Sequence, residues 1–492
     1  KIIDGYDFVN KDNDPMDDHG HGTHVAATVA GDGVLDDGRD IKGVAPDAKL
    51  VAYKVLNDGG GGYFVEIIAA IEKSIDPNGD GNFDDHWDAI SMSLGARCLG
   101  KYSPSCGPDD ALSRAVDRAV DAGVVAVIAA GNSGPWEETI GSPGTARKAI
   151  TVGSINKTGE VSYFSSRGPI IVEWDKKNLV KPDIVAPGAN ICAAQWDNWL
   201  DSRRCVDENH IAISGTSMAT PHIAGTVALI KQMHPDWSPT QIKSVLKSTT
   251  RDFDGSVLTW GSGLIDALQA VEESDNPPVA ELRPIFNQGD ITIQGNIITQ
   301  DLKEWSLSYA LAGSETNWIE LTRSSQIPTS DNLFTIQSAI PEGEYVVRLF
   351  VEDVDGQTAV DYGYFEIKML DILNPLDNDI SRVGDEITIE LDGTYKYLTS
   401  KEFILEYRRG VEWTTAIRTE NEPLVWDTTG LRKGSYGIRV TLLSGDININ
   451  KETNVYLDDT LKEGWPVRIP WASCGIDCNV LGGSRYQPGN LE

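Results

Sequence analysis

Residues 213–225 read ISGTSMATPHIAG, a stretch that predicts the start of a helix with a serine in its first turn. Ser217 lies between Thr216 and Met218, and apolar residues follow at helical spacing. Pro221 is acceptable in this helix only within the first turn, so we expect Ser217 to stand at the helix start, just ahead of the apolar helical run. The partial positive charge of a helix N-terminus favours negative charge that develops beside it. A serine here therefore has surroundings suited to a nucleophile.

A nucleophilic serine needs a base within hydrogen-bond reach, and a histidine on a separate element can supply it. Residues 17–26 read DDHGHGTHVA and hold three histidines. We expect His21 to be the base, His24 to be buried one helical turn further on, and His19 to lie in a solvated loop. A metal site is the alternative, but no thiolate or later histidine-rich motif completes it.

The stretch VIAAGNSGP (127–135) predicts a buried strand that ends at an asparagine. In α/β sheets, side chains at the carboxyl end of such a strand face the ligand. The amide of Asn132 is therefore placed to donate to a tetrahedral oxyanion together with the backbone N–H of Ser217. Singly, Ser217 could be a helix cap and Asn132 the end of a strand. Their occurrence together with His21 indicates a catalytic site.

Short apolar runs alternate with helical patterns over residues 1 to about 272, which predicts a mostly parallel α/β sheet. The expected strands, buried on both faces, are 49–55, 124–130 and 149–155. Helices are expected at 109–122 and after Ser238-Pro239.

After SDNPP (274–278) the helical periodicity ends, and β-rich stretches separated by turn residues follow. Two segments, from Trp305 and from Phe403, resemble each other: each has an aromatic-x-Leu-x-Tyr stretch, a tryptophan, and a Gly-x-Tyr-x-x-Arg stretch. We expect two all-β sandwich modules of the Ig/FnIII-like type. The expected boundaries are 1–273 for the α/β domain, 277–369 and 370–460 for the modules, and 461–492 for a tail or the start of a further domain.

The chain has 74 acidic and 42 basic residues, and its formal net charge of -32 argues against nucleic acid or an anionic membrane surface as partner. Apolar runs are too short for a transmembrane helix, and no signal peptide is recognisable. Because the chain opens with Lys1, we expect a processed or truncated product.

Six cysteines fall into three close pairs, which favours local disulfides in an oxidising compartment, although spacing alone does not fix their connectivity. The pairs are Cys98 with Cys106, Cys192 with Cys205, and Cys474 with Cys478. We therefore expect a secreted protein or one at the extracellular surface.

In chain order, HGTHVA, SMSLG (91–95), AAGNSG, YFSSRGP (163–169), KPDIVAPG (181–188) and GTSMATPHIAG resemble the motifs of the subtilisin-like serine proteases, the subtilases of peptidase family S8. The resemblance covers nearly all of residues 1–272 and none of the β-rich part. It implies a three-layer α/β fold and a serine endopeptidase acting on polypeptides, with Ser217 as nucleophile, His21 as base and Asn132 as oxyanion donor. It also implies cleft walls to which the substrate adds as a strand, at Ser93, Leu94, Gly95, Ala129, Ala130 and Gly131.

One part of the family pattern is missing. Subtilases carry the aspartate that orients the histidine in an Asp-(Ser/Thr)-Gly turn well before it, whereas Asp4 precedes Gly5 directly and lies too close to His21. We assign no residue as this aspartate and expect that the chain lacks an N-terminal segment. A catalytically inactive binding or scaffold protein is the alternative. In a third interpretation the β modules are the functional part and contact a cell surface or matrix.

The stretch DPNGDGNFDDHWD (76–88) places oxygen-bearing side chains at alternate positions, as at the start of an EF-hand loop. Trp87 stands where that loop has its bidentate glutamate, so a complete EF-hand is excluded. We expect a structural calcium ion held by Asp76, Asn78, Asp80, Asn82, Asp84 and Asp85. An acidic solvated loop with Asn-Gly and Asp-Gly turns is the alternative.

Overall fold

The computed structural model describes residues 1–461 apart from 36–37, 99–101, 173–177, 198–200, 252–254, 274–275, 288–289, 338–339 and 399. The chain divides into two compact units. The first contains Lys1–Asn287, Ile291–Ile336 and Glu344–Glu366, and the second contains the chain from Ile367 onward.

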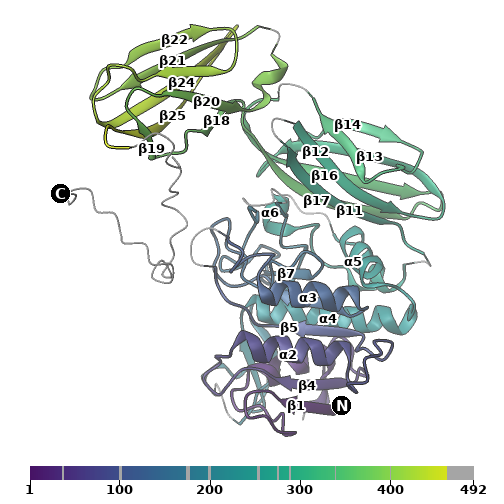
Figure 1. Cartoon of the computed structure of the whole chain (residues 1–492). Helices are drawn as coiled ribbons and strands as arrows, with labels where there is room; N and C mark the ends of the chain where they lie inside the picture. Colours follow the sequence, from purple (N-terminus) through teal and green to yellow (C-terminus); the bar gives the residue numbers. More distant parts are fainter. Residues whose placement is uncertain are drawn as a thin grey trace. The chain divides into compact units, whose positions relative to one another are not determined.

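Parallel strands form the centre of the α/β part of the first unit (Figure 1). They make a two-stranded sheet, β1 (Ile2–Asp7) with β4 (Leu50–Lys54), and a four-stranded sheet in the order β5 (Ala89–Met92), β6 (Val125–Ala129), β7 (Ile150–Ile155), β8 (Ile184–Pro187). Every residue of β6 and β7 is buried, as expected for the runs 124–130 and 149–155. The run 49–55 does form a strand, β4, but the expectation that it is buried on both faces was wrong, because β4 is only half-buried along its length. Its second edge borders a cavity described below.

Helices cover both faces of the four-stranded sheet, which gives three layers. On one face α1 (His21–Ala30) and α4 (Thr216–Met233) pack on the sheet, with Val29, Val127 and Ile223 in one core. On the other, α2 (Phe64–Ile75) and α3 (Ala111–Asp121) enclose a second core. The remaining elements of this part are β2 (Asp32–Val34), β3 (Asp40–Lys42), β9 (Ile191–Ala194), η1 (Asp201–Arg203), β10 (His210–Ile213), α5 (Pro239–Ser248), α6 (Val257–Trp260) and α7 (Ala267–Val271).

Two sheets follow in the first unit, and we call them the first β module. The three-stranded sheet has the order β11 (Val279–Asn287), β12 (Asp290–Ile298), β15 (Asn332–Ile336). The four-stranded sheet has the order β14 (Ile319–Ser324), β13 (Leu302–Leu311), β16 (Gly343–Asp353), β17 (Thr358–Ile367).

The second unit also has two sheets, and one core that contains Ile389, Trp426, Phe403 and Val440 draws residues from both. One sheet has the order β18 (Asp371–Asn374), β20 (Glu386–Asp392), β23 (Leu424–Asp427). The other has the order β19 (Asp379–Arg382), β25 (Ile447–Asp458), β24 (Gly434–Ser444), β21 (Glu402–Arg408), β22 (Thr414–Thr419). A short helix η2 (Thr394–Tyr397) lies between β20 and β21.

The repeated sequence pattern has a structural counterpart in both units. Its aromatic-x-Leu-x-Tyr and Gly-x-Tyr-x-x-Arg stretches form neighbouring antiparallel strands, β13 with β16 and β21 with β24. The arginine of the pattern stacks on its tryptophan in each case, Arg348 on Trp318 at 4.4 Å and Arg439 on Trp413 at 4.2 Å. These tryptophans therefore pack within their own units and form no open aromatic platform.

The structure contains the disulfides Cys98–Cys106 and Cys192–Cys205, as the sequence predicted. Cys474 and Cys478 lie outside the described residues. In the described part of the chain, none of the helices has the length and apolar character needed to cross a membrane.

Candidate active site

Ser217 is the second residue of α4, and it exchanges two hydrogen bonds with Ser93 of the loop after β5. The Ser217 hydroxyl donates to the carbonyl oxygen of Ser93 at 3.4 Å, a long and weak bond. The Ser93 hydroxyl donates to the carbonyl oxygen of Ser217 at 2.7 Å. Ser217 is therefore held through its backbone carbonyl oxygen, while its hydroxyl makes only a weak hydrogen bond.

The sequence placed Pro221 in the first turn of this helix, and that was wrong by one turn. α4 begins at Thr216, so Pro221 lies inside the helix. A proline has no N–H to donate to the carbonyl four residues before it, which here belongs to Ser217. The hydroxyl of Ser93 supplies the missing donor. The helix therefore tolerates the proline because a neighbouring loop completes its hydrogen bonding.

Asn132 follows β6 and reaches the turn before Ser217. Its Oδ1 atom accepts hydrogen bonds from the backbone N–H of Thr216 at 2.9 Å and from the Thr216 hydroxyl at 3.1 Å. A backbone N–H can only donate, so these bonds fix which end of the amide is oxygen. The point where a Cβ on Gly215 would lie is 3.5 Å from Nδ2 of Asn132 and 3.6 Å from the backbone nitrogen of Ser217. The NH₂ group of Asn132 and the backbone nitrogen of Ser217 therefore lie close to the same point at Gly215.

His21 is the first residue of α1, and Asp17 holds the start of that helix. The Asp17 carboxylate accepts hydrogen bonds from the backbone N–H groups of His19, Gly20 and Thr23 and from the Thr23 hydroxyl, at 2.6–2.9 Å. Burial alone would raise the pKa of Asp17, but these bonds lower it overall. Asp17 is thus a capping residue whose oxygens are occupied.

The His21 ring is half-buried, and burial, followed by the nearby His19 and His24 rings, lowers its pKa to about 4. Its ring contacts His19 edge-to-face at 6.5 Å between centroids. His24 is buried, as expected, with Nε2 near the carbonyl oxygens of Ile191 and Ile211. His19 is not the fully solvated loop residue we expected, because it is half-buried against Gly60.

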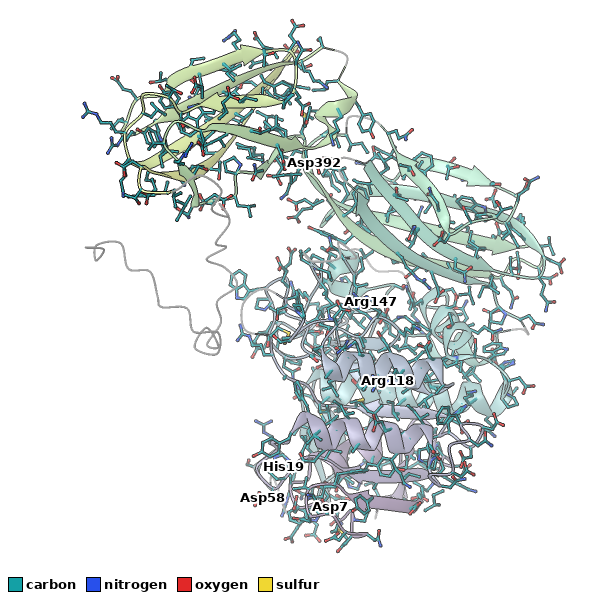
Figure 2. The ribbon with its side chains drawn as sticks, viewed as in Figure 1. Asp7, His19, Asp58, Arg118, Arg147 and Asp392 are labelled. Atoms are coloured by element: carbon teal, nitrogen blue, oxygen red, sulfur yellow. A yellow bond between two sulfur atoms is a disulfide. The ribbon has the colours of Figure 1, made fainter. Side chains whose placement is uncertain are left out.

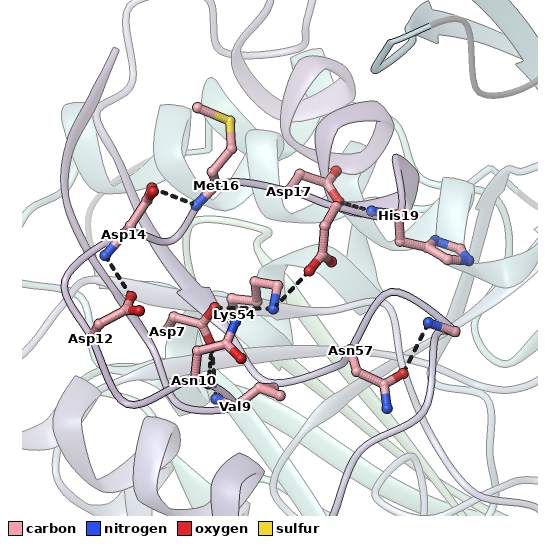
Figure 3. Close-up of polar contacts among 12 residues, drawn as sticks. Asp7, Val9, Asn10, Asp12, Asp14, Met16, Asp17, His19, Lys54 and Asn57 are labelled. Atoms are coloured by element: carbon pink, nitrogen blue, oxygen red, sulfur yellow. Dashed lines mark hydrogen bonds and ion pairs between the residues drawn. The ribbon is translucent and has the colours of Figure 1, made fainter.

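The acidic residues between β1 and α1 are engaged with the backbone and with Lys54 (Figure 3). Buried Asp7 pairs with Lys54 at 3.0 Å, and Lys54 also pairs with Asp18 at 3.2 Å. Figure 2 shows Asp7 and His19 in the same part of the α/β domain. Among the described residues, no carboxylate is hydrogen-bonded to the ring of His21. The base therefore has no orienting acid in this arrangement.

His21, Asn132 and Ser217 line one cavity of about 1860 Å³. Five of the six expected wall residues line it as well: Ser93, Leu94, Gly95, Ala129 and Gly131. Ala130 does not, because it is fully buried and packs with Ile140 behind the wall.

The sequence analysis missed other lining residues, among them Thr139, Gly141 and the glycines Gly59–Gly62. For residues 59–62, the run of four consecutive glycines is the feature of the sequence that could have indicated a role in the cavity. A Cβ on Gly62 would lie 2.3 Å from the carbonyl oxygen of Val55, so only glycine fits there.

The same cavity separates the two parallel sheets. It is lined by β4 on one side and β5 on the other, with Ile67 of α2 and Ala224 of α4 among the side chains between them. β4 pairs with β1 and β5 pairs with β6; in the described residues no strand pairs with either of their opposite edges. The gap thus has parallel strand edges on both sides and apolar side chains above and below.

The loop 76–88 is described in full, and its side-chain oxygens bind the loop's own backbone. The Asp76 carboxylate accepts from the N–H groups of Gly79, Asp80 and Gly81, and Asn78, Asp80 and Asn82 each accept from the residue two positions on. Within the described residues, no group of three or more His, Cys, Asp or Glu side chains is placed to hold a metal ion. In this arrangement the loop does not fit the expected calcium ion, and the metal remains a prediction from sequence.

The fold and the site define a three-layer α/β protein that groups a serine, a histidine and an asparagine at one cavity, the arrangement of a serine hydrolase. A sequence model of the subtilase family matches residues 1–274, more than half of the chain, and the chain belongs to this family. The resemblance inferred from the motifs is thereby confirmed.

Among its relatives is serine protease AprX of Bacillus subtilis (strain 168), 42% identical over 285 residues, which are 55% of this chain and 62% of AprX. Subtilisin DY of Bacillus licheniformis is 35% identical over 276 residues, 55% of this chain and 85% of that protein. Subtilisin Savinase of Lederbergia lenta is 36% identical over 266 residues, 54% of this chain and 82% of that protein. The chain spans less than two thirds of the length of AprX.

Proposed function

We propose that the α/β domain is the catalytic part of a secreted serine endopeptidase that hydrolyses peptide bonds through an acyl-enzyme. The observation that carries this is that His21, Asn132 and Ser217 line one cavity, with Asn132 Nδ2 and the Ser217 backbone nitrogen both close to the same point at Gly215. Two converging donors next to a nucleophile are what a tetrahedral oxyanion requires.

In this proposal the Ser217 oxygen attacks the scissile carbonyl carbon while His21 accepts the serine proton. The carbonyl oxygen becomes an oxyanion and accepts hydrogen bonds from Asn132 and from the backbone N–H of Ser217. The C–N bond then breaks, and His21 gives its proton to the departing amine. Water then attacks the carbonyl carbon of the acyl-enzyme while His21 accepts a proton from the water. The ester C–O bond breaks, the carboxylic acid product leaves, and His21 returns the proton to the Ser217 oxygen.

We further propose that the acid that orients His21 is carried by a strand that fits between β4 and β5. Both edges belong to parallel strands and point unpaired backbone groups into the gap. The cavity that contains the gap also contains the His21 side chain, so a carboxylate at the end of such a strand would meet the ring. That contact would raise the pKa of His21 and fix its tautomer.

Polypeptide substrates would lie along the cleft between the walls at Ser93–Gly95 and at Ala129 and Gly131. The substrate would add as a strand, with backbone hydrogen bonds supplying affinity. Secretion is proposed on the two disulfides, which persist in oxidising compartments.

The second candidate is a binding or scaffold protein with the same fold and no cleavage. The observation that favours it is the lack of a carboxylate bonded to His21 among the described residues. In subtilisin, a member of this family, loss of the aspartate alone lowers kcat about 3 × 10⁴-fold.

Labelling with a fluorophosphonate separates the two candidates. We expect the hydroxyl of Ser217 to be labelled when a strand that carries the orienting acid fills the β4–β5 gap, and Ser217→Ala to abolish the signal. Ser214→Ala is the matched control, since this exposed serine lies near Ser217 and accepts a bond only from the N–H of Asn190. If no labelling depends on Ser217, the endopeptidase proposal fails.

A further inference from the structure

The outer face of the four-stranded sheet in the first β module is covered. Successive residues of a strand point to opposite faces, yet Val346 and Val347 of β16 are both fully buried. Val347 is on the face of Leu349, the partner of Leu307 in β13. Antiparallel sheets usually leave the second face to solvent, so burial of Val346 there needs a partner.

That partner is the α/β domain. Val346 and Tyr364 form one apolar cluster with Val257 and Leu258 of α6, and Ile171 and Val180 pack against it. Tyr364 is only 3% exposed, and burial, with Glu344 and Glu138 adding to it, raises the pKa of its hydroxyl. A large buried aromatic at the centre of an apolar contact contributes strongly to holding two surfaces together.

Polar contacts surround this cluster. The buried ammonium of Lys247 in α5 pairs with Asp361 of β17, whose other oxygen accepts the backbone N–H of Leu282 at 2.7 Å. The Ser256 hydroxyl, just before α6, donates to Glu315 at 3.0 Å. Separating a buried, hydrogen-bonded ion pair costs free energy. The Lys247–Asp361 pair therefore favours one alignment of the β module on α5.

A continuous set of backbone bonds connects this contact to the substrate cleft. The carbonyl oxygen of Leu258 accepts the N–H of Gly168 at 2.9 Å, and that of Gly168 accepts the N–H of Glu138 at 3.3 Å. The N–H of Thr139 then bonds to the carbonyl oxygen of Arg167 at 2.9 Å. Thr139 lines the cavity that holds the candidate active site, as does Gly141 two residues on.

Apolar packing follows the same route. Ile170 and Val172 are fully buried against Ile140 and Ala130. Ala130 in turn accepts the N–H of Gly141 at 3.1 Å. The cleft wall at 139–141 therefore has α6 and the segment 167–172 directly behind it.

We propose that the first β module is a positioning element of the catalytic unit: Tyr364 holds α6 and segment 167–172 against the cleft wall at 139–141, and Asp361 fastens the module to α5 through Lys247. The kinetic part of the test rests on the proposed endopeptidase function; the structural part does not. The module is then required for substrate binding, whereas a spacer would leave the cleft unchanged.

The structural test is hydrogen exchange in the full chain with Ser217→Ala, which prevents self-digestion. We expect Tyr364→Ala to speed exchange of the Thr139 and Gly141 amides at least about tenfold, because local opening would no longer be opposed by the module. Leu307→Ala is the matched control, since it removes a fully buried side chain from the module's interior face. Equal exchange at 139–141 in both variants would overturn the proposal. If Tyr364→Ala does not fold, Asp361→Asn keeps the side-chain shape and is compared in the same way.

The kinetic test uses the protein with an active Ser217. We expect Tyr364→Ala to raise KM for a peptide substrate about tenfold while the fluorophosphonate labelling rate stays near that of the parent, because the probe does not use the wall at 139–141. Parallel loss of labelling and peptide cleavage would mean that the module acts on the catalytic residues instead, and would overturn the proposal. A parent protein that is not labelled would refute the endopeptidase function alone, and the exchange result would still decide the role of the module.

Discussion

Asn132 is held by Thr216, the residue directly before the candidate nucleophile. Its Oδ1 atom accepts both the backbone N–H and the hydroxyl of Thr216, at 2.9 and 3.1 Å, which leaves the NH₂ end of the amide free for a substrate. The Thr216 hydroxyl also accepts the N–H of Gly131 at 3.2 Å. The oxyanion donor is thereby oriented before any substrate arrives, so no binding energy is spent on orienting it.

Asn132→Leu should therefore lower kcat with little change in KM, because the donor acts only on the charge that develops in the transition state. In subtilisin itself, loss of such a donor lowers kcat about 10²–10³-fold, and we expect the same order here. Thr216→Val keeps the backbone bond and should cost less. Steady-state kinetics on one peptide substrate test both, and a change confined to KM would contradict the role given to Asn132.

Ser93→Ala should destabilise the protein, because Pro221 has no N–H to donate to the Ser217 carbonyl and the Ser93 hydroxyl donates to it instead. A buried acceptor left without a partner costs about 1–3 kcal/mol. Pro221→Ala restores an N–H at the right place in the helix, so the double variant should recover part of the loss. Urea unfolding of the four proteins, each with Ser217→Ala, measures this coupling. Additive effects would show that the two residues are independent.

Gly20 is the N-cap residue of α1, but the Asp17 carboxylate accepts the N–H groups at the helix start, so Asp17→Ala should lower the free energy of unfolding by about 1–2 kcal/mol, as loss of a capping side chain does. Asp14→Ala is the control, since exposed Asp14 accepts only the N–H of Met16. The pKa of Asp17 is lower in the folded state than in the unfolded state. Its contribution is therefore complete above the unfolded pKa of about 3.9 and disappears as pH falls through the folded value. We expect the melting temperatures of the parent and of Asp17→Ala, measured between about pH 6 and pH 2, to become equal at the acid end of this range.

His21 should titrate near its folded pKa of about 4 in residues 1–492. Because this pKa lies below the ordinary value, the unfolded chain binds the proton first, and stability falls as pH drops from about 6.5 toward the folded value. Nuclear magnetic resonance of the His21 ring in Ser217→Ala measures the midpoint. A strand that carries a carboxylate into the β4–β5 gap should raise it. A midpoint already near 6.5 without that strand would contradict the structure around His21.

Calcium should raise the melting temperature if the loop 76–88 rearranges to bind it, because a ligand bound only by the folded state stabilises it. Asp76 and Asp80 would then have to exchange backbone N–H groups for the ion. We expect Asp80→Asn to abolish the shift and Asp47→Asn, at a separate loop, to leave it intact. A melting temperature unaffected by both chelator and added calcium would remove the calcium prediction.

The local parts of the fold and the site follow from sequence, because they depend on nearby residues. The apolar runs that became β6 and β7, the helix expected at 109–122 and the start of α5 after Ser238 are set by periodicity and capping chemistry. The two disulfides within the described residues join the close pairs that the sequence favoured, although spacing alone left their connectivity open.

The features that the sequence did not predict depend on contacts between residues that are far apart in the chain. The run 49–55 reads as a strand buried on both faces, but its burial requires a neighbour on the second edge. Pro221 is tolerated because of Ser93, far away in sequence. Thr139 and Gly141 carry no chemistry of their own, and only the folded chain brings them to the cleft.

The gap between β4 and β5 also bears on how this polypeptide behaves in concentrated solution. Unpaired strand edges are templates for backbone pairing with any other chain, and proteins normally cover or charge them. Here two such edges face each other across an apolar space, so a strand from a neighbouring molecule would gain hydrogen bonds on both sides. We therefore expect residues 1–492 by themselves to exchange strands and aggregate, and a strand that fills the gap to favour a monodisperse protein.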